Sequence, residues 1–207
     1  MKSIACDIVL LPEASLNDIA ISASQRLSDF DGLLTLNNTD CYAHTSLYML
    51  QLDEDILPKV NEILARIARS FAPIHLEAYR FDSGRGYIDA EYRRNKQIDD
   101  LQEQILEALN PLRAGMREKD KAYMEYATGD VLKNLQKYGY ENVGEQFRPH
   151  LTLTRLKEDN ESAVDTLGAV ENFSGQFPQI GIFEMGDHGT SIRKIATFKL
   201  GAFIKQT

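Results

Sequence analysis

The sequence predicts an α+β protein with two lobes related by a pseudo-twofold axis, each an antiparallel sheet with helices on the outside, which form a central cleft. Two observations support this prediction: a short phrase that occurs twice, and the same order of predicted elements after each copy. The chain has 207 residues, of which 43% are hydrophobic and 26% are charged. That length and composition are typical of one globular domain with a sizeable core.

The repeated phrase is a histidine, any residue, a small hydroxyl residue and a leucine. It occurs as HTSL from His44 and as HLTL from His150. Each copy is followed by a predicted helix, a proline, a strand, a glycine-containing turn and another strand. Identities between the copies are few, so the shared order of elements carries the argument. The repeat units span about 41–93 and 148–200 of a single bilobal domain over 1–207.

The first half of the chain alternates strands and helices. An apolar run that Pro12 stops predicts the first strand, and period-two alternation predicts the strand that holds the first phrase. Apolar residues at helical spacing, with Pro58 in the first turn, predict the helix after it. The predicted elements are a strand over 2–11, a helix over 15–29, a loop over 30–40, a strand over 41–51, a helix over 53–71, strands over 73–81 and 86–93 around the turn DSGRG, and a helix over 95–112.

The second half begins with a helical insertion over about 113–147. This segment is predicted to cap the cleft, to pack outside it or to make a dimer contact. The repeat then resumes with a strand that contains the second phrase. The predicted elements are a helix over 121–138 within the insertion, a strand over 148–156, a helix over 160–173, and strands over 179–185 and 191–200 around the turn GDHGT.

Charge and cysteine content narrow the choice of partners. The formal net charge is −8, so the protein gains little from the field of a long polyanion, and a nucleic-acid partner is expected to be short or only a chain end. No stretch approaches the ~20 apolar residues of a membrane span, so no membrane partner is expected. Cys6 and Cys41 form no metal-binding or redox spacing, which favours packing roles in a reduced cytoplasm.

Strand geometry gathers polar groups at the repeated phrase. Because residues i and i+2 of a strand point to one face, His44, Ser46 and Tyr48 are predicted to share a face. The same rule places His150, Thr152 and Thr154 together in the second copy, and Arg148 has the parity of His150. Two such strands that face one cleft supply two imidazoles and two hydroxyls around a single point.

This set of groups suits a phosphodiester. One neutral histidine acts as general base on an attacking water or hydroxyl, and the other, protonated, donates a proton to the leaving oxygen. Ser46 and Thr152 donate hydrogen bonds to the non-bridging oxygens. Such an acid–base pair requires no metal and no cofactor. Which histidine is the acid and which is the base stays open at this point.

Other candidate residues are less specific. His188 also has a hydroxyl residue, Thr190, two places on, but it lies in a glycine turn and is expected near the cleft. His75 has no counterpart in the repeat and is expected to be structural. A local basic patch is a further hypothesis, against scattered surface charge; its members are Arg80, Arg85, Arg148, Arg155, Arg193 and Lys194.

The paired HTSL and HLTL resemble the two signature motifs of the 2H phosphoesterases, the superfamily of 2′-5′ RNA ligase-like proteins and cyclic nucleotide phosphodiesterases. The resemblance implies a bilobal α+β fold with both motifs in a central groove. It implies that His44 and His150 are the acid–base pair and that Ser46 and Thr152 bind phosphate. Tyr48 falls where members often carry an aromatic residue, and Arg155 follows the second motif as a basic residue often does.

The resulting prediction is a metal-independent phosphoesterase that acts on a 2′,3′-cyclic phosphate, or a related cyclic phosphodiester, at a nucleotide or short RNA end. Arg148, Arg155 and Tyr48 are candidate substrate-binding residues. Two alternatives remain open: a 2′-5′ RNA ligase or a hydrolase of a non-RNA cyclic phosphate, and a catalytically silent module that binds a nucleotide or RNA. The sequence does not indicate the oligomeric state.

Overall fold

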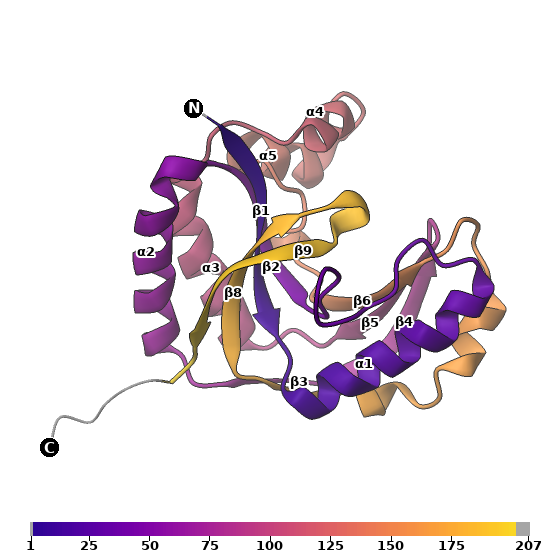
Figure 1. Ribbon diagram of the computed structural model, residues 1–207. Coiled ribbons are helices and arrows are strands. Elements are labelled where there is room, and N and C mark those ends of the chain that lie inside the picture. The colour runs from indigo at the N-terminus through magenta and orange to yellow at the C-terminus, as the bar shows by residue number, and fades with distance from the viewer. Residues whose placement is uncertain (1, 202–207) are drawn as a thin grey trace, which may run out of the picture.

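The computed structural model describes residues 2–201 and shows a seven-stranded antiparallel sheet flanked by helices (Figure 1). The strand order is β4-β5-β6-β2-β1-β8-β9. The strands are β1 (Ser3–Leu11), β2 (Thr45–Asp53), β4 (Ala78–Gly84), β5 (Tyr87–Tyr92), β6 (His150–Arg155), β8 (Gln179–Met185) and β9 (Ser191–Lys199). A small second sheet pairs β3 (Ile74–Leu76) with β7 (Gly175–Phe177).

The large sheet consists of two antiparallel halves that meet at one point. One half is β4-β5-β6 and the other is β2-β1-β8-β9. The register joins β6 to β2 through a single pair of residues, Thr45 and Leu151. These halves are the two predicted lobes, and the α+β fold class with two antiparallel lobes is confirmed.

The chain exchanges strands between the lobes. The hairpin β4-β5 follows the first phrase in the sequence but pairs with β6, which carries the second phrase. The hairpin β8-β9 lies in the half that contains β2, with β1 between them. Each lobe therefore combines the phrase of one repeat unit with the hairpin of the other.

Five α-helices surround the sheet within residues 2–201: α1 (Ala14–Leu27), α2 (Leu57–Ser70), α3 (Lys96–Leu109), α4 (Glu118–Met124) and α5 (Gly129–Tyr138). The helices α2 and α3 cover the half that contains β2, and α1 covers the half that contains β6 (Figure 1). Asn95 is the N-cap of α3, because its side chain accepts hydrogen bonds from the amides of Gln97 and Ile98. The buried face of α3 then packs its aliphatic side chains into the common core.

Two predicted helices differ from the structure. Residues 160–173 form two short 3₁₀ segments, Glu161–Thr166 and Val170–Phe173, rather than an α-helix. Gly168 separates them with a φ of 78°, a left-handed conformation that interrupts an α-helix. The helix predicted over 121–138 is split in two, because Gly129, the first residue of α5, adopts a left-handed φ of 59°.

A β-bulge occurs at the same place in both phrases. Along the β1–β2 ladder, Val9 faces Ser46 and Ile8 faces Tyr48, so Leu47 is an extra residue in β2. Along the β5–β6 ladder, Asp89 faces Thr152 and Ile88 faces Thr154, so Leu153 is the extra residue in β6. The carbonyl of Leu47 accepts a hydrogen bond from the buried Gln102 side chain of α3.

The bulges place some side chains on the other face of the strand from the one that was predicted. An extra residue reverses the alternation beyond it, so Tyr48 and Thr154 turn to the core and not to the face of the histidines. Tyr48 is fully buried, and its hydroxyl lies 2.8 Å from the Tyr138 carbonyl and 3.0 Å from Oδ1 of Asn110. Met49 takes the place on the histidine face that Tyr48 was predicted to occupy.

Cys6 and Cys41 are both buried and free. Burial raises the pKa of the Cys6 thiol to about 12 and that of the Cys41 thiol to about 11. Both side chains belong to the hydrophobic core. Among residues 2–201, no helix has the length and apolar character needed to cross a bilayer.

The Tyr48→Phe substitution tests the structural position of this side chain. The free energy of unfolding should fall by about 1–3 kcal/mol, because the change removes the hydroxyl donor from the part-buried carbonyl of Tyr138 and from Oδ1 of Asn110. Urea unfolding measures it. Tyr126→Phe is the control, since Tyr126 is 71% exposed and its loss should change stability by less than about 0.5 kcal/mol. A Tyr48→Phe protein with unchanged stability but weaker ligand binding would contradict the buried position.

Candidate active site

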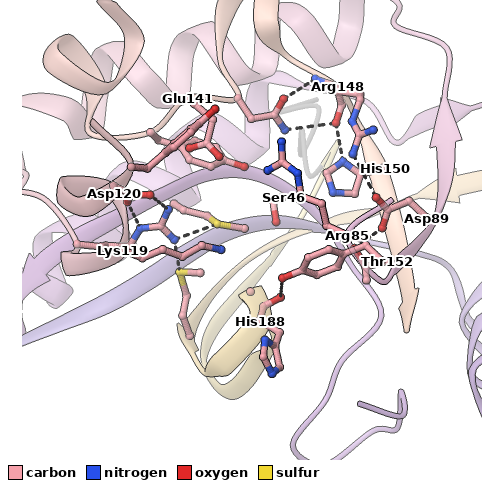
Figure 2. Close-up of a pocket in the computed structure, with 18 of the residues that line it drawn as sticks. Ser46, Arg85, Asp89, Lys119, Asp120, Glu141, Arg148, His150, Thr152 and His188 are labelled. Carbon is pink, nitrogen blue, oxygen red and sulfur yellow. Dashed lines mark hydrogen bonds and ion pairs between the residues drawn. The ribbon is translucent and has the colours of Figure 1, made fainter. Parts of the chain in front are cut away.

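A cavity of about 770 Å³ is lined by residues from both lobes, and both copies of the repeated phrase contribute to it (Figure 2). Thr45 and Leu151 face each other in antiparallel register and are both fully buried. Their neighbours must therefore point to the opposite face of the sheet. His44, Ser46, His150 and Thr152 all lie on that face and line the cavity.

The two histidines are held in the same way. Nδ1 of His44 lies 2.7 Å from the carbonyl oxygen of Tyr42, and Nδ1 of His150 lies 2.7 Å from the carbonyl oxygen of Arg148. A carbonyl only accepts, so Nδ1 carries a proton in both rings. Each Nε2 is then the atom that exchanges a proton: it is a base in the neutral ring and an acid in the charged ring.

The two hydroxyls also have equivalent partners. Ser46 donates to Oδ2 of Asp7 over 2.6 Å, and Thr152 donates to Oδ1 of Asp89 over 2.7 Å. Both carboxylates are buried. They do not occupy equivalent positions, because Asp89 faces Thr152 directly whereas Asp7 faces Met49 beyond the bulge. Each hydroxyl proton is therefore directed at a carboxylate in this structure.

The charges around the two carboxylates differ. Asp89 lies 3.2 Å from the guanidinium of Arg148. Asp7 is fully buried, one of its oxygens has no hydrogen-bond partner, and Oδ2 lies 3.5 Å from Nε2 of His44. That distance is an ion pair rather than a short hydrogen bond. Burial disfavours the charged imidazole, but Asp7 outweighs it, and the pKa of His44 is raised.

The candidate substrate-binding residues have different positions. Arg148 lines the cavity, but its guanidinium also contacts Asp82, Asp89 and Glu91. Arg155 does not line the cavity; it donates to Nδ1 of His188, which does line it. Tyr48 is in the core and has no contact with the cavity, as described above. His75 is exposed in β3 and is not part of the cavity lining.

The insertion over 113–147 forms one wall of the cavity. Arg117 holds Asp120 through two hydrogen bonds, contacts the sulfur atoms of Met49 and Met185, and lies over the ring of Tyr140. Of the three predicted arrangements, the structure shows a segment that lines the cleft. Its lining residues are Arg117, Lys119, Asp120, Tyr123, Tyr140, Glu141, Asn142 and Gln146.

The sequence patterns did not indicate Asp7 or Asp89 as residues of the site. A carboxylate within the apolar run IACDIVLL was one available signal, because an ionisable residue in a central strand is expensive unless it has partners. Asp89 had no comparable signal, since its strand alternates and a polar residue there reads as exposed. Within residues 2–201, no group of three or more His, Cys, Asp or Glu side chains is arranged to hold a metal ion.

Comparison with solved structures shows the fold. LigT of E. coli, solved with phosphate, has a TM-score of 0.55 at 10% identity, over 97% of this chain and 99% of LigT. TT0787 of Thermus thermophilus has a TM-score of 0.54 at 14% identity, over 96% and 98% of the two chains. A structure described as a phosphoesterase has a TM-score of 0.52 at 11% identity, over 96% and 99%. The predicted resemblance to the 2H phosphoesterases is confirmed for the fold.

Comparison of sequences identifies the family. No curated protein sequence matches the chain. A family described as "Protein of unknown function (DUF1045)" matches residues 50–180, which is more than half of the chain. The match begins after the first phrase and includes the second. The chain therefore belongs to this family, and it has the fold of the 2H phosphoesterases.

Proposed function

We propose that the protein is a metal-independent phosphoesterase that opens a 2′,3′-cyclic phosphate, or a related cyclic phosphodiester, at a nucleotide or short RNA end. One observation carries this proposal: two histidines on one cavity have their Nδ1 atoms fixed by carbonyls, so that both Nε2 atoms are available for proton transfer. LigT, which shares the fold, has been solved with phosphate and with 3′-AMP. Both ligands carry a phosphoryl group, and 3′-AMP is a monoester of the kind that ring opening of a 2′,3′-cyclic phosphate would leave.

The surroundings of the histidines support a proposal for their roles. His44 lies beside the buried Asp7, which favours its protonated form, so His44 is the general acid. Within residues 2–201 no carboxylate lies within ion-pair distance of His150, and the nearby Asp89 is engaged by Arg148, so His150 is the general base. Nε2 of His150 takes a proton from water as the new P–O bond forms. Nε2 of His44 gives its proton to the leaving oxygen as the old P–O bond breaks.

Ser46 and Thr152 reach the phosphate by turning their protons. A hydroxyl rotates about its C–O bond, so each proton can move from a carboxylate to a non-bridging oxygen without displacement of a heavy atom. Each carboxylate then keeps one cationic neighbour, His44 for Asp7 and Arg148 for Asp89. The hydroxyls therefore bind phosphate without leaving a buried charge unpaired.

The first test is product analysis on 2′,3′-cyclic and 2′-5′ linked substrates in the presence of EDTA. Turnover of the cyclic phosphate should persist, because the proposed proton transfers involve only the two imidazoles. Loss of activity in EDTA that a divalent ion restores would indicate a metal mechanism. Joining of 2′-5′ ends in place of ring opening would indicate a ligase, and binding of every substrate without conversion would indicate a binding module.

Replacement of the two histidines tests whether they act together in proton transfer. His44→Ala and His150→Ala should each lower kcat by about a hundredfold or more, the usual scale for a positioned acid or base. The double variant should lose much less than the product of the two effects, because the pair acts as one unit. Steady-state kinetics measures this. His75→Ala is the matched control on an exposed strand, and equal losses in all three single variants would refute the assignment.

The Asp7→Asn substitution tests the assignment of the acid. Asp7 raises the pKa of His44, so removal of its charge should lower that pKa. NMR titration of the His44 imidazole measures the change without any substrate. The protonated acid is then lost at a lower pH, and the alkaline limb of kcat/KM should move in the same direction. Asp89→Asn is the control, and a pKa of His44 that responds to Asp89→Asn but not to Asp7→Asn would reverse the roles.

A further inference from the structure

Two hairpin turns at the cavity contain residues in an unfavourable backbone conformation. Outside glycine, only Asp31, Arg85 and His188 have positive φ within residues 2–201. Arg85 (φ 55°) and Gly86 (φ 81°) connect β4 to β5, and His188 (φ 60°) and Gly189 (φ 80°) connect β8 to β9. Both Arg85 and His188 line the cavity, whereas Asp31 does not.

The turn geometry does not explain the choice of Arg85. Two consecutive residues with positive φ form a type I′ turn, for which Asn-Gly, Asp-Gly and Gly-Gly are strongly preferred. Histidine tolerates this conformation better than most residues, but a long side chain such as arginine is an outlier there. An unfavourable conformation that is retained at a cavity points to a role for the side chain. The Arg85 side chain projects into the cavity in Figure 2.

Neighbouring side chains tie the two turns together and orient His188. The Tyr87 hydroxyl donates to the His188 carbonyl over 3.3 Å, and the Arg155 guanidinium stacks on the Tyr87 ring. Arg155 also donates to Nδ1 of His188. An arginine only donates, so Nδ1 is unprotonated and the neutral His188 ring carries its proton on Nε2. His188 thus carries an N–H donor on a second turn of the cavity that Arg85 also lines.

Within the described residues, two cations of the cavity have no carboxylate partner. Arg117 and Arg148 are engaged by carboxylates. Within the described chain, neither Arg85 nor Lys119, which enters from the opposite wall in α4, has a carboxylate within 4.0 Å of its charged group. Glu141 and Asp187 also line the cavity, so net charge does not select the ligand. The ligand is selected by the N–H donors of Arg85 and His188, which match the oxygens of an anion.

The volume of the cavity leaves room for such a group. A single phosphate between the two histidines occupies a small part of about 770 Å³, which is in the range that accommodates a ligand of drug-like size. We propose that the turns of Arg85 and His188 bind a second anionic group of the substrate, a phosphate monoester, apart from the phosphodiester at the histidines. This inference rests on the proposed function for the identity of the first group.

The experiment compares two unreactive ligands that differ by one phosphate, adenosine 2′-phosphate and adenosine 2′,5′-bisphosphate. Calorimetry should show that the wild-type protein binds the bisphosphate at least ~10-fold more tightly, the scale expected for one charge-assisted contact. The ratio of the two affinities should approach one in Arg85→Asn and should fall in His188→Asn. Arg85→Lys, which keeps the charge but not the planar fork, should retain part of the preference.

Asparagine is the replacement of choice because Asn-Gly is favoured in the type I′ turn, so thermal unfolding should occur at or above the wild-type midpoint. The matched control is Asp31→Asn, the same left-handed conformation away from the cavity, which should leave the affinity ratio unchanged. Equal affinities of the wild-type protein for both ligands would overturn the proposal. So would an Arg85→Asn protein that loses affinity for both ligands equally, since Arg85 would then bind the phosphate at the histidines.

Turnover separates this inference from the proposed function. Adenosine 2′,3′-cyclic phosphate, with and without a 5′-phosphate, is the substrate pair. If neither is converted while the wild-type protein still prefers the bisphosphate, the second anion site stands and the phosphodiesterase proposal fails. If both are converted equally well and the affinity ratio is one, the phosphodiesterase proposal stands and the second anion site fails.

Discussion

The backbone pairing of Thr45 with Leu151 is the contact on which the site depends. It is the one register pair between β2 and β6, and it joins the two halves of the large sheet. Because both residues point into the core, the residues on either side of them point to the cavity. A displacement of one residue in this pairing would place His44 and Ser46 on the face of the sheet opposite to His150 and Thr152.

The β-bulges limit what each phrase presents to the cavity. Up to the hydroxyl residue, the alternation of β2 and β6 places polar groups on the cavity side. Leu47 and Leu153 then add one residue each, and the next large side chain returns to the core. In β2 this places Tyr48 in the hydrophobic core. The side chain of Gln102 in α3 donates a hydrogen bond to the carbonyl of the bulged Leu47.

The two phrases make equivalent hydrogen bonds, but the charges around their carboxylate partners differ. Both histidines donate from Nδ1 to a carbonyl, and both hydroxyls donate to a buried carboxylate. The symmetry ends at the partners of those carboxylates: Arg148 engages Asp89, whereas Asp7 has only His44 as an ion-pair partner within the described residues. In a buried setting an unbalanced carboxylate favours a proton on its neighbour, so one frame can hold an acid and a base.

The sequence by itself determined the α+β class, nearly all strands, the repeated phrase and the four polar residues that line the cavity with it. These features follow from local periodicity and from a rare residue pattern, and both are present in the sequence independently of tertiary structure. The predictions from sequence placed Tyr48 on the wrong face, assigned a helix to residues 160–173 and did not include Asp7 or Asp89. Gly168 interrupts that helix locally, whereas tertiary structure decided the other points, because the bulge and the partners of each carboxylate involve segments distant in the chain. The exchange of hairpins between lobes is of the same kind, since β4-β5 pairs with β6, the strand that carries the phrase of the other repeat unit.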